Sequence, residues 1–304
     1  MDRWEGIDAF VAVAESGRFA NAAALLGVSN SHVSRLIARL EERLQTRLFY
    51  RSTRQVRLTE TGHTFLAHCR RLQDGFDDAL HAVQDLEGTP KGMLRMTCAL
   101  TYGERFVVPL VNDFIARHPQ LRVEIELTNR TLDIVQEGFD LAVRLGRLSD
   151  SRLVATRLAP RVMYLCAAPD YLARRGLPTL EDLAQHDCLV GTSDTWVFQA
   201  NGSVRTLRVS GRWRCNSGQA VLDAALRGFG LCQLPDYYVR EPLGDGRLQA
   251  LLPDLQPPDT AVWAVFPAQR HRSPKVRLLV EHLRHGLSMR LEYQERDAAL
   301  RSPA

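Results

Sequence analysis

The stretch from residue 19 to residue 61 constrains the fold of this chain more than any other. It reads FANAAALLGVSNSHVSRLIARLEERLQTRLFYRSTRQVRLTET. A short Ala-rich segment is followed by Gly27, Ser29, a second segment rich in polar residues and arginine, and an arginine-rich hairpin pattern. This order is typical of a helix-turn-helix with a wing, which reads the major groove of double-stranded DNA. We expect such a domain at residues 1–58.

Small residues and caps support this prediction. Ala22 and Ala23 would let the first helix approach the second closely, and Gly27 would supply the turn. Ser29 is placed to cap the second helix, expected at residues 30–43, because its hydroxyl can accept a hydrogen bond from a free backbone amide of the first turn.

Polar side chains gather near the N-terminal end of the second helix, which is the part of a recognition helix that enters the groove. The hairpin that follows would set arginines against phosphates or into the minor groove. The residues that we expect to contact DNA are Ser29, Asn30, Ser31, His32, Ser34 and Arg35 on the helix, and Arg51, Thr53 and Arg54 on the wing.

The charge of the chain is concentrated in the same region. The formal net charge of the 304 residues is only +4. Residues 35–71 hold nine arginines and three glutamates, a local net charge of +6. A local basic field of this kind suits a phosphate backbone, although a solvated charged face is the alternative interpretation.

A third helix, at residues 59–87, is expected to open at Thr59, whose hydroxyl can cap it. Seven of its residues repeat with alternating spacings of four and three, which is a heptad stripe. An isolated helix would expose this stripe, so it predicts either a dimer contact or, as the alternative, packing against the helix's own domain. Residues 88–92, with two glycines and one proline, predict a hinge. The heptad stripe consists of Phe65, Cys69, Leu72, Phe76, Ala79, Val83 and Leu86.

From Met93 onwards the pattern alternates between strands and helices, which predicts parallel α/β packing. In the first set we expect helices at residues 102–117 and 132–137, separated by the alternating strand LRVEIELT and followed by the strand DLAVRL. In the second set we expect a helix at residues 219–227 and a strand at AVWAVFP. A closing helix is expected at residues 275–286, and the chain beyond Glu292 is expected to be a polar, frayed tail.

The runs AAALLGVSNSHVSRLIARLEERL and LFYRSTRQVRLTETG resemble the N-terminal domain of LysR-type transcriptional regulators. Further on, EGFDLAVRLG, APDYLARRGLP and AALRGFGLCQLP resemble the regulatory domain of that family. Two positions depart from the family's usual pattern: Asn30 stands where Gln is common, and His32 where a small apolar residue is more usual. Arg18 stands where a Ser-like cap is commoner.

The resemblance implies an α/β chain with an all-α N-terminal part, in which the linker helix dimerises. It also implies a regulatory domain at residues 93–290 similar to type II periplasmic binding proteins, with a ligand cleft between two lobes. Lobe one is expected at residues 93–161 and 267–290, lobe two at 162–266, and the polar tail at 291–304. The implied function is DNA-binding transcription regulation, in which a small-molecule effector in the cleft modulates promoter binding or DNA bending.

The cleft residues follow partly from the fold itself. Ligands of such sheets bind at the carboxyl ends of strands and the N-termini of helices. Each residue could instead be a cap or loop residue, and Arg144 and Arg147 hint at an anionic effector such as a small carboxylate. The effector contacts expected from strand ends, from a possible apolar wall and from the family's positions are Leu100, Thr101, Tyr102, Thr128, Asn129, Arg144, Gly146, Trp196, Asn216 and Ser217.

The sequence gives little support to other classes of function. The six cysteines form no CxxC pair or metal-ligand pattern, and no cofactor is expected. A redox-responsive regulator using Cys215 and Cys232 is the alternative, whereas a cleft enzyme lacks a recognisable catalytic motif. A transport-type binding protein would need a signal peptide. We expect a cytoplasmic protein that does not enter a membrane. Its expected partners are promoter DNA, further copies in a dimer or tetramer, a small effector and RNA polymerase.

Overall fold

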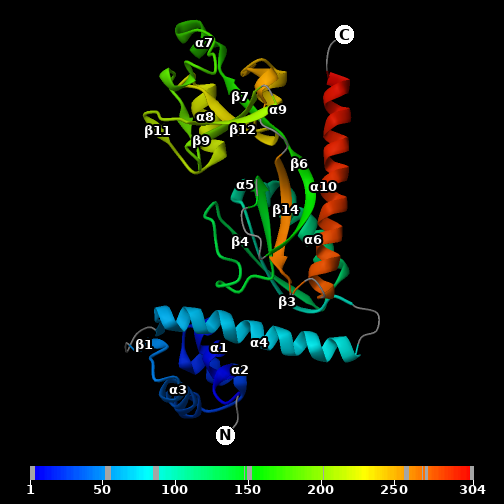
Figure 1. The fold of residues 1–304 in the computed structure, drawn as a ribbon. Helices are drawn as coiled ribbons and strands as arrows, with labels where there is room; N and C mark the ends of the chain where they lie inside the picture. The colour runs from blue at the N-terminus through cyan, green and yellow to red at the C-terminus, as the bar shows by residue number, and fades with distance from the viewer. Residues whose placement is uncertain are drawn as a thin grey trace.

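The chain forms three parts stacked end to end in the computed structural model (Figure 1). The N-terminal domain lies at one end, one α/β lobe lies in the middle, and a second lobe lies at the other end. The structure describes residues 4–51, 56–84, 89–146, 148, 153–200, 202–256, 260–268, 270 and 273–301.

The N-terminal domain is a three-helix unit with a two-stranded wing. The α2 and α3 helices form the predicted pair, and Gly27 at the turn has a φ of +67°, which glycine adopts without strain. The Ser29 hydroxyl accepts a hydrogen bond from the His32 backbone N–H at 3.2 Å, so the predicted cap is confirmed. The elements are α1 (Ile7–Ser16), α2 (Phe19–Leu26), α3 (Asn30–Leu44), β1 (Phe49–Arg51) and β2 (Val56–Leu58).

The long helix α4 (Glu60–Gln84) begins where the sequence predicts, because the Thr59 hydroxyl accepts a hydrogen bond from Gly62 N–H at 2.9 Å. It runs beneath the middle lobe (Figure 1). Its Ala67 is 4% exposed and lies against Gly138 of that lobe, where a Cβ on Gly138 would be 3.6 Å from the Ala67 Cα. The linker helix therefore contacts the regulatory part of its own chain.

The middle lobe is built on a five-stranded sheet with the order β4-β3-β5-β14-β6. Strand β3 is parallel to β4 and β5, whereas β14 is antiparallel to β5 and β6. Helices α6 (Val108–Arg117) and α10 (Pro274–Arg301) bury residues such as Phe114 and Leu279 in the core that includes the sheet residues Met96 and Leu141. The strands are β3 (Gly92–Cys98), β4 (Leu121–Leu127), β5 (Leu141–Gly146), β6 (Leu153–Arg161) and β14 (Thr260–Pro267).

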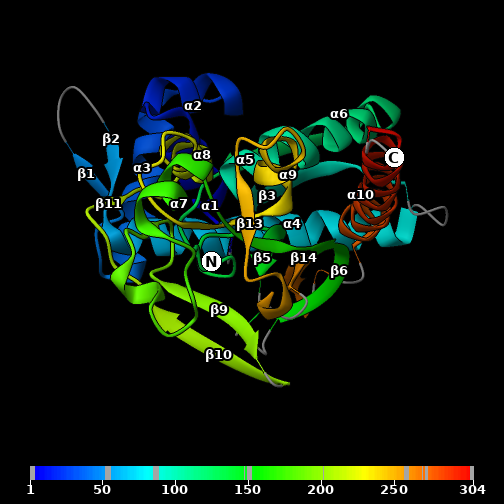
Figure 2. The same ribbon diagram turned by 90° about the horizontal axis from the view of Figure 1, so that it is seen from above.

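The other lobe is reached by a short crossover at Val162, between β6 and β7. It contains a three-stranded antiparallel sheet, β12-β7-β13, and the hairpin β9-β10, which projects to one side (Figure 2). Its strands are β7 (Met163–Ala167), β8 (Leu189–Val190), β9 (Thr195–Ala200), β10 (Ser203–Arg208), β11 (Trp213–Arg214), β12 (Cys232–Pro235) and β13 (Gln249–Leu251). Its helices are α7 (Pro169–Arg175), η2 (Leu183–Gln185), α8 (Gly218–Leu226), α9 (Asp236–Gly244) and η3 (Pro253–Leu255).

Strand β14 corrects the predicted lobe boundary. Its residues pair with both β5 and β6, with Val262 opposite Leu145 and Ala159. Residues 260–266 therefore belong to lobe one, although the sequence placed them in lobe two. The assignment failed because an apolar run shows that a strand is buried but not which sheet it joins.

Two helix predictions in lobe one also need correction. Residues 132–137 form only a single turn, closed by the Glu137 N–H and the Asp133 carbonyl at 2.9 Å, because Leu132 and Ile134 are buried against the sheet. The predicted helix at 102–117 is divided into α5 (Leu100–Tyr102), a π-helical turn η1 (Gly103–Val107) and α6.

The closing helix is much longer than predicted. Helix α10 continues to Arg301, so the expected frayed tail is wrong for the part that the structure describes. Gly286 lies inside the helix and does not end it. Its missing side chain leaves room for Leu110, since a Cβ there would lie 2.5 Å from the Leu110 Cδ2. No glycine or proline follows until Pro303, so nothing in the sequence stops the helix earlier.

Candidate functional sites

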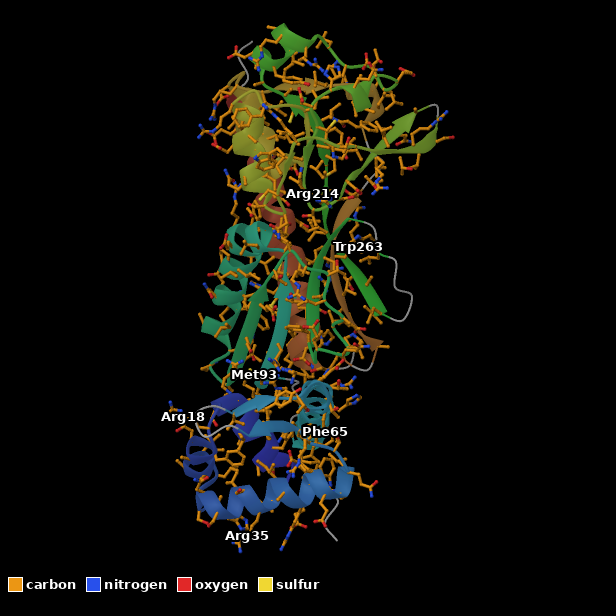
Figure 3. All side chains as sticks on the ribbon, turned by 90° about the vertical axis from the view of Figure 1, so that its left-hand side faces the viewer. Arg18, Arg35, Phe65, Met93, Arg214 and Trp263 are labelled. Atoms are coloured by element: carbon orange, nitrogen blue, oxygen red, sulfur yellow. The ribbon has the colours of Figure 1, made fainter. Side chains whose placement is uncertain are left out.

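The N-terminal end of α3 presents a polar surface. Asn30, Ser31, His32 and Arg35 are exposed, and Ser34 is half-buried. Arg35 lies at the end of the molecule farthest from lobe two, with its side chain pointing outward (Figure 3). The predicted helix contacts thus lie together at the N-terminal end of α3, and all but Ser34 are exposed. Of the predicted wing contacts, Thr53, Arg54 and the side chain of Arg51 lie outside the described residues.

The heptad stripe of α4 divides into two parts. Phe65 packs on Phe10 with ring centroids 5.2 Å apart, and Cys69 is completely buried in the core of the N-terminal domain. These two residues therefore follow the alternative interpretation, packing on their own domain. Leu72 and Phe76 are 49% and 59% exposed and remain available to a partner. Leu86 and the side chains of Ala79 and Val83 lie outside the described residues.

A cleft of about 500 Å³ lies between the two lobes. It is formed by strand ends and loops of lobe one and by β7, α8, β12 and α9 with neighbouring loops of lobe two. Eight of the ten predicted effector contacts line it: Thr101, Tyr102, Thr128, Asn129, Arg144, Gly146, Trp196 and Asn216. The other two serve the backbone locally. Leu100 donates its N–H to the Asn129 Oδ1 at 3.1 Å, and the Ser217 hydroxyl caps α8.

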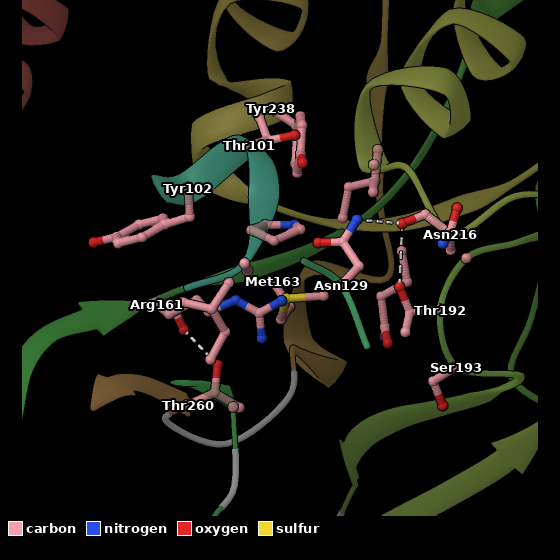
Figure 4. Close-up of a pocket in the computed structure, with 18 of the residues that line it drawn as sticks. Thr101, Tyr102, Asn129, Arg161, Met163, Thr192, Ser193, Asn216, Tyr238 and Thr260 are labelled. Atoms are coloured by element: carbon pink, nitrogen blue, oxygen red, sulfur yellow. Dashed lines mark hydrogen bonds between the residues drawn. The ribbon is translucent and has the colours of Figure 1, made fainter. Parts of the chain in front are cut away.

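Hydrogen bonds cross the cleft between the lobes (Figure 4). The Asn129 Nδ2 of lobe one donates to the Asn216 carbonyl of lobe two at 2.7 Å. Within lobe two, the Thr192 hydroxyl donates to the same carbonyl at 3.5 Å. The Arg105 guanidinium of lobe one also donates to the Tyr237 carbonyl of lobe two at 2.8 Å. The two lobes are thus joined by direct hydrogen bonds.

Several residues that line the cleft were missed from the sequence. Among them are Arg161, Met163, Gln233, Tyr237 and Tyr238. Arg161 is the last residue of β6, so the strand-end rule could have found it. The others come from lobe two, and only the three-dimensional arrangement of the lobes brings them to the cleft. Tyrosine hydroxyls are protonated near neutral pH and can donate hydrogen bonds, and burial raises the pKa of Tyr237 and Tyr238 further.

The cleft is electropositive. Among the described residues that line it, the charged side chains are Arg130, Arg144 and Arg161, and none is a carboxylate. Burial lowers the pKa of Arg144, yet a guanidinium remains charged at physiological pH. Its Nη2 donates to the Leu132 carbonyl at 2.7 Å. The walls therefore favour an anionic occupant.

The cysteines do not form the pair that the sequence suggested for a redox switch. Cys232 faces Cys166 across β12 and β7, with sulfur atoms 3.4 Å apart, while Cys215 is half-buried in the loop after β11. The hydrogen bond shared with Cys166, together with burial, raises the pKa of the Cys232 thiol. A protonated, buried thiol is a poor nucleophile, so this pair lacks the environment of a reactive cysteine.

Comparison with known proteins identifies the two halves of the chain. Residues 4–63 match the bacterial regulatory helix-turn-helix protein family of the lysR type, and residues 87–288 match the LysR substrate binding domain. The chain belongs to the LysR-type family of transcriptional regulators. Its N-terminal domain is therefore the DNA-binding domain, and its two-lobed part the effector-binding domain, of a LysR-type regulator.

Similar proteins span nearly its full length. It is 32% identical to the transcriptional activator TtdR of Escherichia coli K12, covering 94% of each chain. It is 35% identical to the regulator PtxR of Pseudomonas aeruginosa, covering 92% of this chain and 91% of PtxR. Full-length AphB, a virulence activator of Vibrio cholerae, has a similar structure, with a TM-score of 0.57, 25% identity and coverage of 94% of this chain and 100% of AphB.

These relatives are transcriptional regulators and not enzymes. Within the described residues there is neither a group of three or more potential metal-binding side chains nor a helix that is long and apolar enough to cross a membrane.

Proposed function

We propose that this LysR-type regulator binds promoter DNA through α3 and the wing, and that a small carboxylate in the interlobe cleft changes this binding. The lining of the cleft carries the proposal, because three arginines and no described carboxylate face it. Many hydroxyl and amide groups accompany them, which suits a polar organic anion better than an apolar ligand. The proposed DNA contacts are those on the exposed face of α3.

We propose further that the DNA-binding form is a dimer joined through Leu72 and Phe76 of α4, and that two dimers form a tetramer in the cytoplasm, next to RNA polymerase. The exposure of these two apolar side chains on a long helix supports the dimer. Two copies would place two recognition helices on two half-sites, whose spacing then contributes to affinity.

Sequencing the DNA that co-purifies with the full-length protein tests the first half of this proposal. We expect enrichment of a site with two related half-sites, and salt-sensitive binding of that site in preference to random DNA. Affinity for the site is then measured with and without small carboxylates, using their neutral amides as controls. Equal binding of random DNA would refute DNA recognition, and an unchanged affinity with every carboxylate would refute the effector class.

A redox-responsive regulator of the same fold is the second candidate, supported only by the closeness of Cys166 and Cys232. The buried, protonated thiols make it the weaker one. Peroxide-dependent DNA binding that disappears in Cys232→Ser would favour it over carboxylate control.

A further inference from the structure

The position of Arg161 distinguishes it from the other two arginines of the cleft. It ends β6, where the chain crosses from lobe one to lobe two. Its carbonyl accepts a hydrogen bond from the Thr260 hydroxyl at 2.8 Å, which fixes its backbone beside the second crossing of the chain. From there its side chain extends into the pocket, between Tyr102 and Asn129 in the view of Figure 4.

The arginines also differ in the acceptors that they already have. Arg130 is exposed at the rim, and an Nη of Arg144 already donates to the Leu132 carbonyl. The Nε of Arg161 is buried and has no hydrogen-bond partner among the described residues. Its guanidinium meets the Tyr237 hydroxyl, which is a neutral group. A buried, charged donor without an anionic acceptor is unfavourable. Of the three arginines, Arg161 would therefore gain most from binding an anion.

Gly146 leaves access to this guanidinium. Gly146 of β5 pairs with Ala261 of β14, and Arg161 of β6 pairs with the adjacent Thr260. Gly146 and Arg161 therefore lie at the same end of the sheet, on either side of β14. A Cβ on Gly146 would be in contact with the Arg161 Nη1, at 3.7 Å, and any longer side chain would cover the guanidinium. The φ of Gly146 is +98°, a value that also favours glycine. Access to Arg161 thus depends on the residue at position 146.

We propose that Arg161 is the carboxylate-binding residue of the cleft and that it determines specificity for an anionic effector. This inference rests on the proposed function, because it requires a carboxylate in the cleft. The carboxylate accepts hydrogen bonds from the Arg161 guanidinium, in the bidentate geometry that guanidinium and carboxylate groups favour. Tyr237 donates to it from lobe two, so the anion contacts both lobes.

Labelling of arginines in the full-length protein by phenylglyoxal, with mass spectrometry of the peptides, tests the assignment without a known effector. The probes are an equimolar mixture of acetate, succinate, malate, citrate and benzoate, and a second mixture of the corresponding amides. We expect modification of Arg161 to slow at least severalfold with the carboxylates and to be unchanged with the amides. Exposed Arg122 should react equally in both.

The other outcomes separate this inference from the proposed function. Protection of Arg144 or Arg130 without protection of Arg161 would overturn the assignment and leave a carboxylate-binding cleft. Protection of none of the three, or equal protection by the amides, would overturn both. Arg161→Gln is expected to weaken binding of the most protective carboxylate by about 10- to 100-fold, the effect of a lost hydrogen bond to a charged group. The matched Arg130→Gln should weaken it less, and circular dichroism checks that both variants fold.

Discussion

The carboxylate of Glu41 accepts a hydrogen bond from the backbone N–H of Leu48 at 2.9 Å. The same oxygen accepts from the Phe49 N–H at 3.2 Å, and the other oxygen pairs with the Arg47 guanidinium at 3.0 Å. Glu41 lies near the end of α3 and is only 4% exposed, whereas Phe49 begins the wing. One buried side chain therefore joins the recognition helix to the wing that flanks it.

Replacing Glu41 by alanine should destabilise the N-terminal domain by about 2–4 kcal/mol, because two buried backbone donors would lose their acceptor. Urea unfolding, followed by far-ultraviolet circular dichroism, measures this change. Glu42→Ala, at the exposed neighbouring position, is the matched control and should change stability by less than about 0.5 kcal/mol. Equal effects of the two substitutions would show that the hydrogen bonds of Glu41 to Leu48 and Phe49 do not stabilise the domain.

Arg35→Ala should weaken binding of promoter DNA by about 1–3 kcal/mol if the side chain contacts a base, and should relax the sequence preference at one position. If the side chain contacts only phosphate, binding of all sequences should weaken together and the salt dependence should become less steep. Fluorescence anisotropy over a range of salt concentrations distinguishes the two. Arg122→Ala, on β4 of the regulatory domain, removes the same charge, and an equal loss there would rule out a direct role for Arg35.

Replacing Leu72 and Phe76 together by glutamate should dissociate the dimer, because the charged side chains would have to be buried in an apolar contact. Analytical ultracentrifugation at several protein concentrations measures the shift toward monomer. His63→Glu lies on the opposite face of α4 and should leave the assembly unchanged. A double variant that sediments like the wild type would place the dimer contact elsewhere.

The stability of the protein should fall as the pH rises above about 9. Burial raises the pKa of the Cys98 thiol from 9.0 to about 12, so the unfolded chain loses this proton at a lower pH than the folded protein. The unfolded state then binds fewer protons than the folded state. Between these two pKa values, each pH unit lowers the free energy of unfolding by about 1.4 kcal/mol. Urea unfolding at pH 8 and pH 10 should show a smaller fall in Cys98→Ala than in the wild type. Equal falls would mean that Cys98 does not contribute.

The local signals in the sequence predicted the N-terminal domain well. Ser29 and Thr59 cap the helices expected of them, because a cap involves only residues within one turn. The strand ends at Thr101 and Asn129 were also found, since the fold class alone places such ends at a cleft. These predictions required no knowledge of distant contacts.

The missed features all depend on distant contacts. Most of strand β14 was expected in the wrong lobe, because its apolar pattern fits either sheet. Arg161 and Tyr237 are 76 positions apart and meet only when the second lobe is in place. The heptad spacing predicts one continuous surface, yet Phe65 and Cys69 complete the core of their own domain. A spacing pattern shows which residues share a face but not what covers that face.

The two crossings of the chain have a mechanical consequence. Arg161 and Thr260 are direct neighbours, so the chain leaves the middle lobe at the end of β6 and returns to it at the start of β14 at one point. If lobe two rotates, this point is the hinge. The hairpin β9-β10 then moves far, whereas Arg161 hardly moves. A molecule bound to Arg161 therefore contacts lobe two close to the hinge. A small movement of lobe two at this contact produces a larger movement at the outer surface of the lobe.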